Sequence, residues 1–270
     1  MTASGTFRGA SAEALHTLTS ALDQVTGDRA VVGQDLFRVA ALLRGEPALR
    51  RVATDQSVAA EAKQGLLREL LVGKVGDVVV DLAGRAVSLR WTASRDLADA
   101  LEHLGVLATV RSADDSADRL ADELFEVGQL VADNPELRDA LSDPARSTAD
   151  KQALVRGILA GKALPATVTL AEQALTGSYR TVGVALHAFQ QVAAAAHNQS
   201  VAEVRVAKPL SDADRQRLGD VLSRQYGRQV HVNVVVDAEV IGGIRVEIGD
   251  DVIDGTVSSR LDSARRALAV

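Results

Sequence analysis

An internal repeat limits the possible folds of this chain more than any other feature of the sequence. Residues 35–74 align without a gap with residues 123–162, at an offset of 88 positions. Fifteen of the 40 aligned positions are identical, including Pro47 with Pro135. Chance is a poor explanation for this agreement, so the sequence predicts a duplicated structural unit.

Each copy of the repeat is predicted to fold into short helices. Leu36, Val39, Ala40 and Leu43 recur at helical spacing in the first copy. The predicted helix ends are Pro47 and Pro135 in first turns, Ser57 and Thr148 at N-caps, and Gly73 and Gly161 at C-caps. The offset also places residues 10–25 onto 98–113, so the latter segment either serves both copies or leads straight from one into the other.

The pattern changes from helical to strand periodicity after residue 200. Val204 and Val206 alternate with polar residues, as expected of a strand. Ser211 opens a helix with a capping-box pattern, in which Asp214 replaces the usual Glu, and Gly227 ends it.

Further strands and a last helix are predicted beyond this point. In 230–236 the four even-numbered valines share one face, and His231 and Asn233 occupy the other. Residues 244–248 alternate in the same way. The last helix carries Val257, Leu261, Ala264 and Leu268.

The predicted fold class is therefore mainly α, with a small α/β domain at the end of the chain. Residues 1–111 are expected to form a first helical-bundle copy and residues 112–197 a second copy. Residues 198–270 are expected to form a β-α-β-β-β-α domain.

Composition narrows the possible functions. The chain of 270 residues has a net charge of −6 and 3% aromatic residues, which disfavours a nucleic-acid partner. It has no cysteine, so a disulfide framework and thiolate chemistry are excluded, and a reducing compartment is expected. No signal peptide is recognisable, and no apolar run approaches the roughly 20 residues that span a bilayer, so no membrane insertion is expected.

The sequence GDDVID, residues 249–254, resembles a magnesium site for a diphosphate, which needs its three aspartates on one helical face. The flanking residues Gly249 and Gly255 oppose a helix, and the preceding residues alternate with period 2. We therefore predict a hairpin turn at Asp250 and Asp251, with Asp254 near the start of the last helix, and no metal site.

No catalytic or cofactor-binding constellation is recognisable elsewhere. Gly242 and Gly243 precede a strand rather than a helix, so a bulge or tight turn is expected instead of a phosphate loop. The histidines lack zinc-ligand spacing. Trp91 and Tyr179 occupy matching repeat positions, where they either pack each copy or mark a ligand pocket.

Residues 201–268 closely resemble the C-terminal domain of the δ subunit of bacterial F-type ATP synthases, the counterpart of the mitochondrial oligomycin-sensitivity-conferring protein. The family pattern is V-x-x-A-x-P-L-S, a helix, a valine-rich strand, and then G-G-x-x-x-x-x-G-D-x-x-x-D-G-S-V-x-x-x-L. The matching positions are Pro209, Gly242, Gly243, Gly249, Asp250, Asp254 and Gly255, and Thr256 replaces the frequent Ser. The additional helical copy resembles the δ subunits of actinobacteria, in an unfused form.

The resemblance implies a non-catalytic stator subunit without a cofactor, at the cytoplasmic face of the cell membrane. Its implied partners are the N-terminal helices of the α subunits and the b subunits of the peripheral stalk. The candidate groove residues for an α-subunit helix are Leu15, Leu18, Leu22, Val78, Val79 and Leu82. Each of them is equally well explained as a core residue, and which copy docks stays open.

Two alternative functions remain at this stage. A free-standing helical adaptor would also contain the repeat, but would bind other partners. A magnesium-dependent diphosphate enzyme would have to use Asp250, Asp251 and Asp254, against their strand context.

Overall fold

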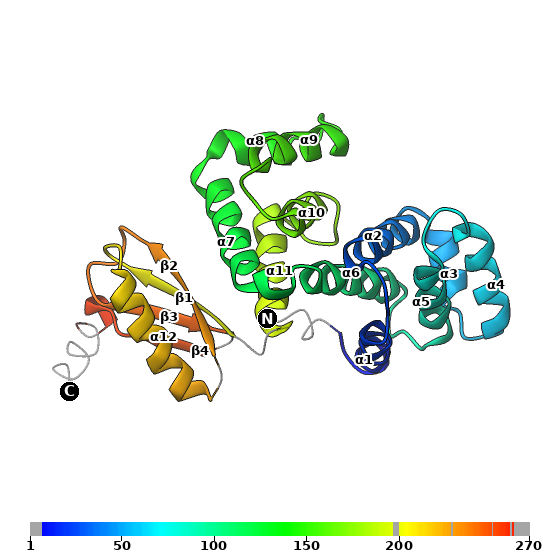
Figure 1. Cartoon of the computed structure of the whole chain (residues 1–270), viewed down its shortest axis with the longest axis horizontal. Helices are drawn as coiled ribbons and strands as arrows, with labels where there is room; N and C mark the ends of the chain where they lie inside the picture. Colours follow the sequence, from blue (N-terminus) through cyan, green and yellow to red (C-terminus); the bar gives the residue numbers. More distant parts are fainter. Residues whose placement is uncertain (1–6, 197–199, 228, 250, 260, 262–270) are drawn as a thin grey trace. The chain divides into compact units, whose positions relative to one another are not determined.

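The computed structural model describes residues 7–196, 200–227, 229–249, 251–259 and 261. The chain is mainly helical, as predicted, and it divides into two compact units, one up to residue 193 and one from residue 194 onward (Figure 1). The described residues of the first unit form only helices, and the second unit contains the sheet.

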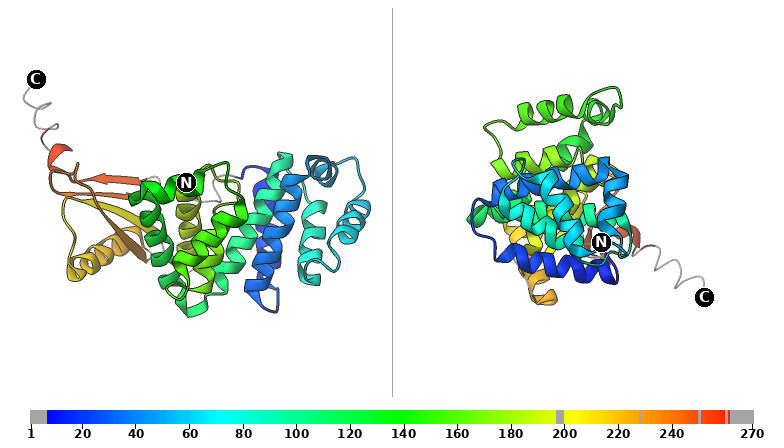
Figure 2. Two further views of the ribbon diagram at one scale, coloured as in Figure 1. Left: turned by 90° about the horizontal axis from the view of Figure 1, so that it is seen from above. Right: turned by 90° about the vertical axis from the view of Figure 1, so that its right-hand side faces the viewer.

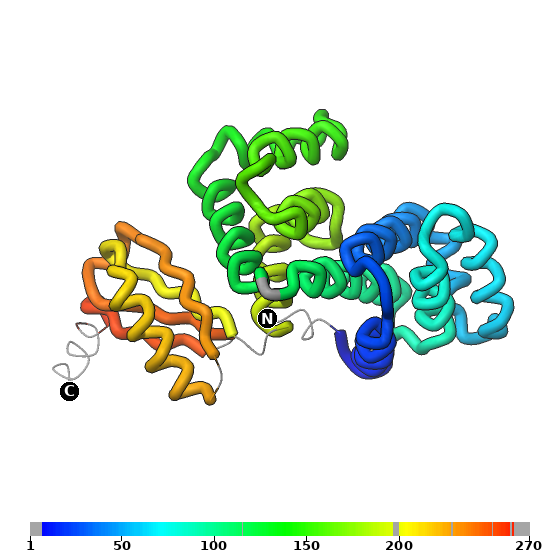
Figure 3. The backbone as a smooth tube through the Cα atoms, in the orientation of Figure 1, coloured from blue at the N-terminus to red at the C-terminus, as the bar shows by residue number. Residues whose placement is uncertain are grey.

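The helical unit repeats its own architecture at the offset of the sequence repeat. The first copy comprises α1 (Ala10–Asp23), α2 (Arg29–Gly45), α3 (Pro47–Thr54), α4 (Ala60–Leu71), α5 (Asp77–Ser88) and α6 (Ser94–Arg111). The chain then forms α7 (Ala117–Asp133), α8 (Pro135–Ser142), α9 (Thr148–Leu159), α10 (Pro165–Gln173) and α11 (Val182–Ala196) (Figure 3). Helices α7, α8 and α9 begin and end 88 residues after α2, α3 and α4, so the predicted duplication is confirmed.

Helix α6 belongs to both copies. It packs against α1, α2, α3 and α5, and also against α7 and α10. The two-sided packing explains why its apolar residues are buried along its whole length, from Leu97 to Val110. Residues 98–111 of α6 are also the repeat equivalent of α1, so the last helix of copy one serves as the first helix of copy two.

Close backbone approach fixes the crossing of α2 and α6, which lie side by side (Figure 2). A Cβ atom added to Gly33 would lie 3.0 Å from the carbonyl oxygen of Gly105, and one added to Gly105 would overlap the Phe37 ring. Only glycine at these two positions allows the helices to pack this closely.

The predicted helix ends are confirmed at the glycines and wrong at two N-caps. Gly73 and Gly161 follow α4 and α9 with φ of 74° and 69°, in the left-handed region that favours glycine. Residue 59 rather than Ser57 is the N-cap of α4, because the Asp55 carboxylate accepts from the Ser57 amide and hydroxyl. In α9 the N-cap is Ser147, one residue before the predicted Thr148.

The sheet unit has the predicted β-α-β-β-β order: β1 (Ser200–Val206), α12 (Asp212–Tyr226), β2 (Val230–Val236), β3 (Ile244–Ile248) and β4 (Asp251–Asp254). The strand order is β2-β1-β3-β4. β1 is parallel to β2 and antiparallel to β3, and β3 is antiparallel to β4. The parallel β1–β2 pair requires a crossover, which α12 provides.

Helix α12 has the predicted caps and packs on the sheet. The Ser211 hydroxyl accepts from the Asp214 amide, and Gly227 ends the helix with φ of 66°. Leu222 of α12 joins a buried cluster with Val204, Val232 and strand residues of β3.

The predicted two-faced pattern of β2 holds only in part. On the face of the four valines, Val230 and Val232 are buried, but Val236 is exposed where the strand ends. On the other face, Asn233 is buried and His231 is half-buried. The last helix begins at Val257, whereas Ala264 and Leu268 lie outside the described residues.

Candidate functional site

Five of the six candidate groove residues lie inside the helical core. Helices α1 and α5 pack against each other, which brings the two predicted groups of residues together. The buried side chains, each at most 7% exposed, are Leu15, Leu18, Leu22, Val79 and Leu82. Val78 on α5 is 37% exposed and is the member of the set that reaches the surface.

The repeat places a second version of this surface on α6 and α10. The equivalents 88 residues later are His103, Val106, Val110, Ala166, Thr167 and Leu170. All except the partly buried His103 are buried, including Ala166 at the position of Val78. Helix α2 packs along α6 and also contacts α10. Copy one therefore packs onto the helix pair that corresponds in copy two to α1 and α5.

Two buried acids at equivalent positions form a polar framework that sequence analysis missed. The Asp35 carboxylate accepts from the Gly76 amide at 2.8 Å, at the start of α5. The Glu123 carboxylate accepts from the Leu164 amide at 2.8 Å, at the start of α10. Each acid neutralises unpaired amide dipoles at a helix N-terminus. Their alignment at the first position of the repeat was the available signal.

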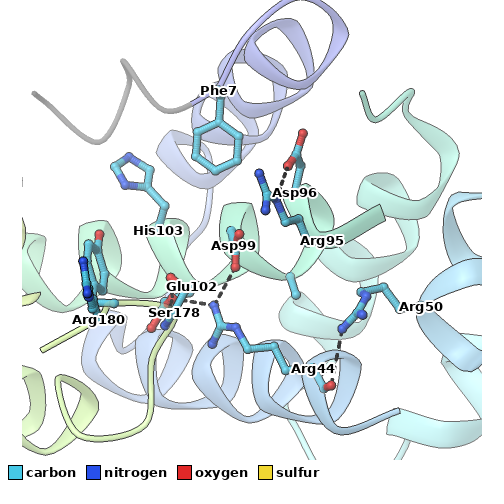
Figure 4. Close-up of a pocket in the computed structure, with 12 residues that line it drawn as sticks. Phe7, Arg44, Arg50, Arg95, Asp96, Asp99, Glu102, His103, Ser178 and Arg180 are labelled. Atoms are coloured by element: carbon cyan, nitrogen blue, oxygen red, sulfur yellow. Dashed lines mark hydrogen bonds and ion pairs between the residues drawn. The ribbon is translucent and has the colours of Figure 1, made fainter. Parts of the chain in front are cut away.

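A cavity of about 570 Å³ opens between α2, α3, α6 and the segment after α10 (Figure 4). Arg44 lines the cavity, and its guanidinium donates to Asp99 at 3.1 Å and to Glu102 at 2.5 Å. Its wall includes Tyr179 and His103. The cavity is thus a charged site in which Arg44 pairs with Asp99 and Glu102, and Asp96 accepts from the Ser11 hydroxyl.

Burial sets the protonation of the groups around this cavity. It lowers the pKa of His103 to about 4, against an opposing effect of Glu102, and raises the pKa of Asp99. Burial also raises the pKa of Tyr179 to about 12, and the negative charges of Glu102 and Asp99 act in the same direction. His103 is therefore neutral at pH 7 and the Tyr179 phenol stays protonated.

The two aromatic residues at matching repeat positions differ in their surroundings. The Trp91 indole donates to the Ala86 carbonyl at 2.8 Å, which fixes it within copy one. The Tyr179 ring contacts Phe189 edge-on, with centroids 5.4 Å apart, and also lines the cavity. Packing accounts for both residues, and Tyr179 additionally faces a pocket.

The glycine motif of the sheet unit makes a close backbone crossing, as expected of a tight turn. Gly243 has φ of 82°, and an added Cβ atom would overlap the carbonyl oxygen of Gly255. The Gly242 carbonyl accepts from the Val257 amide at 2.9 Å, and the Gly255 amide donates to Ile244 at 2.9 Å. Pro209 lies exposed between β1 and α12.

The aspartate run forms a β-hairpin instead of a helix. Ile248 pairs with Asp251 across β3 and β4, and Gly249 has φ of 60° in the connecting turn. The Asp254 carboxylate accepts from the Thr256 amide and hydroxyl, which lowers the pKa of Asp254. Thr256 in turn accepts from the Ser259 amide and caps the last helix.

A helical three-aspartate site is therefore incompatible with this backbone, although Asp250 itself lies outside the described residues. Among the residues with described positions, no three His, Asp or Glu side chains are grouped so that they could hold a metal ion. Within the same residues, no helix is both long and apolar enough to cross a membrane.

Comparison with known proteins identifies the family. A family model described as ATP synthase delta (OSCP) subunit matches residues 106–268. A protein described as ATP synthase subunit delta from Nocardioides sp. is 60% identical, over 97% of each chain. Proteins of the same description from Kineococcus radiotolerans and Streptomyces avermitilis are 42% and 41% identical, over at least 97% of each chain. The chain belongs to the ATP synthase delta (OSCP) subunit family.

The family model and the three relatives differ in how much of the helical unit they match. The family model begins within α6 and covers copy two and the sheet unit. The three relatives match nearly the whole chain, copy one included. Copy one is therefore an addition to the part of the chain that the family model describes, and it is shared with these actinobacterial relatives.

Proposed function

We propose that this chain is a non-catalytic subunit of the peripheral stalk of F-type ATP synthase, where it joins the catalytic α/β head to the b subunits. The observation that carries the proposal is the match to ATP synthase delta subunits over nearly the whole length of both chains. Rotation in the complex drives ATP synthesis only if the head is held still, so a joint of this kind couples the two processes.

The proposed partners are the N-terminal helices of the α subunits and the b subunits. A bundle of short helices suits this role, because an amphipathic helix can dock in an apolar groove through a few side-chain anchors. Two separate contacts on one chain also raise the overall affinity through effective concentration. The location that follows is peripheral, at the cytoplasmic face of the cell membrane.

Copy one is proposed to receive the α-subunit helix. The surface at α1 and α5 retains an exposed apolar side chain, Val78, whereas its equivalent Ala166 in copy two is buried. Docking on copy one would then use Val78 as its exposed apolar contact, because Leu15 and Val79 are buried. The b subunit would bind elsewhere on the chain.

The test is a substitution at Val78 in the full chain. Val78→Asp places a charge on the exposed surface of α5 and is expected to weaken binding of a synthetic peptide with the sequence of the α-subunit N-terminus. Peptide binding is measured by fluorescence anisotropy, and folding by circular dichroism. Val31→Asp on α2, also an exposed valine, is the matched control and should bind normally.

Equal binding by the Val78→Asp and Val31→Asp variants would contradict docking at α1 and α5. Substitutions at Val79 and Leu82 test folding instead of docking, since both side chains are buried. Val79→Asp should reduce the helical signal itself, because an unpaired charge in a core is strongly unfavourable.

A further inference from the structure

A buried carboxylate connects the two helical copies. Glu102 of α6 is 2% exposed, and both of its oxygens have partners. Its Oε2 atom accepts from Arg44 at 2.5 Å and from the Ser178 hydroxyl at 2.8 Å. Its Oε1 atom accepts from the Gln173 side-chain amide at 2.7 Å. We call Arg44, Glu102, Gln173 and Ser178 the Glu102 network; Figure 4 shows Arg44, Glu102 and Ser178.

The partners of Glu102 come from both copies. Arg44 lies on α2 of copy one, whereas Gln173 and Ser178 lie on and just after α10 of copy two. Glu102 itself projects from the helix that the copies share. The chain also makes room for the carboxylate, because a Cβ atom added to Gly177 would overlap Oε1 of Glu102.

The residues of this network are not repeated at the equivalent positions of the other copy. The equivalents of Arg44, Gln173 and Ser178 in the other copy are Ala132, Arg85 and Arg90. Glu102 itself corresponds to an alanine in α1 and to a glutamine in α11. By contrast, the acids that organise each copy internally, Asp35 and Glu123, occupy equivalent positions. The Glu102 network therefore joins side chains of both copies through the helix that they share, and the repeat has no second version of it.

We propose that the Glu102 network is a polar lock that fixes the orientation of copy two relative to copy one. Ionic and hydrogen-bonded contacts are directional, so they select one arrangement where apolar packing would tolerate several. A buried carboxylate that loses its hydrogen-bond donors costs free energy. Any arrangement of the copies that separates Glu102 from Gln173 and Ser178 is therefore less stable. Only the mechanical consequence, a stiffer joint in the stalk, rests on the proposed function.

The test measures the distance between the copies in the full chain. The sequence has no cysteine, so spin labels can be placed at Ala62→Cys on α4 and Glu126→Cys on α7, both exposed positions. The double variant Gln173→Leu, Ser178→Ala removes the side-chain partners from copy two and keeps the Arg44–Glu102 ion pair. Pulsed electron paramagnetic resonance should then show a broader or shifted distance distribution than in the parent chain.

Two controls separate a lock from general loosening. A second label pair, Ala62→Cys with His16→Cys on α1, reports on copy one alone and should be unchanged. The matched variant Arg156→Gln, Glu172→Gln also removes two side-chain hydrogen bonds, but both lie within copy two. It should leave the distance between the copies unchanged.

A second variant disturbs the network without removing any of its side chains. Gly177→Ala retains every polar group of the network, but its methyl group displaces the Glu102 carboxylate. It should shift the distance between the copies in the same way. Unchanged distances in both Gln173→Leu, Ser178→Ala and Gly177→Ala would overturn the proposal. Equal broadening within copy one, or equal broadening in the Arg156→Gln, Glu172→Gln control, would overturn it as well.

Discussion

At the scale of single residues, the partly buried His103 links folding to pH. Its pKa is about 4 in the folded chain and about 6.5 when unfolded. Between these values the unfolded chain takes up a proton that the folded chain does not, so stability falls as the pH falls from 7 to 4. We expect His103 to account for a loss of about 2 kcal/mol between pH 7 and pH 5.

The measurement is urea unfolding of the parent chain and of His103→Gln at both pH values. The variant should lose less free energy of unfolding on acidification, because glutamine does not titrate. Asp99 acts in the opposite sense, since its raised pKa favours proton uptake by the folded chain, and it is present in both proteins. An identical pH dependence in the two proteins would exclude this role for His103.

The paired buried acids predict a second effect at the residue scale. Asp35→Ala and Glu123→Ala each remove the acceptor for an amide at a helix start, and each should cost about 1–3 kcal/mol of the free energy of unfolding. Asp81→Ala, which removes an exposed ion pair with Arg68, should cost less than about 1 kcal/mol. Urea midpoints followed by circular dichroism compare the three variants. Similar costs for all three would mean that the buried acids do not organise the copies.

At the scale of single elements, the turn before β3 depends on one glycine. Gly243→Ala and Gly249→Ala both place a side chain at positive φ, which costs about 1–2 kcal/mol. Only the Gly243 side chain would also overlap the backbone at Gly255, whereas Gly249 has open space around it. Gly243→Ala should therefore destabilise the sheet unit more.

Hydrogen exchange of the β3 and β4 amides in the full chain measures this difference. Faster exchange in Gly243→Ala than in Gly249→Ala is the expected result. If the two variants exchange at the same rate, the close crossing of Gly243 and Gly255 does not limit the stability of the sheet.

Elements with a local signature were predictable from the sequence. The repeat and the apolar spacing predicted the helices, and Gly249 beside alternating residues predicted the hairpin. The cap at Ser57 was wrong because Asp55 competes for its hydroxyl, a choice that spacing alone does not reveal. Each hydrogen bond of the Glu102 network joins residues up to 76 positions apart, and no pattern along the chain reports such contacts.

The same limit applies to the candidate interface. Periodicity marked Leu15, Val78 and Val79 as apolar helix residues, but it does not distinguish a groove from a core. Burial separates Val78 from the others. Their assignment to an α-subunit contact stays a prediction, and so does the division into three domains.

At the scale of the whole molecule, duplication changes how a helical unit can be used. Sharing α6 makes the two copies one continuous core, and α2 of copy one packs against α6 and α10. The position of Val78 is exposed in copy one, whereas its equivalent in copy two, Ala166, is buried. This difference is the reason for proposing that copy one, and not copy two, docks on the catalytic head.

If this chain works as part of ATP synthase, it must copurify with the other subunits of the complex. The tagged full chain is isolated from its own membranes in mild detergent, and the material is examined by native mass spectrometry. We predict one copy of the chain in a complex with α, β and b subunits. A chain free of synthase subunits, in an extract that contains intact synthase, would contradict the claim and favour a free-standing adaptor.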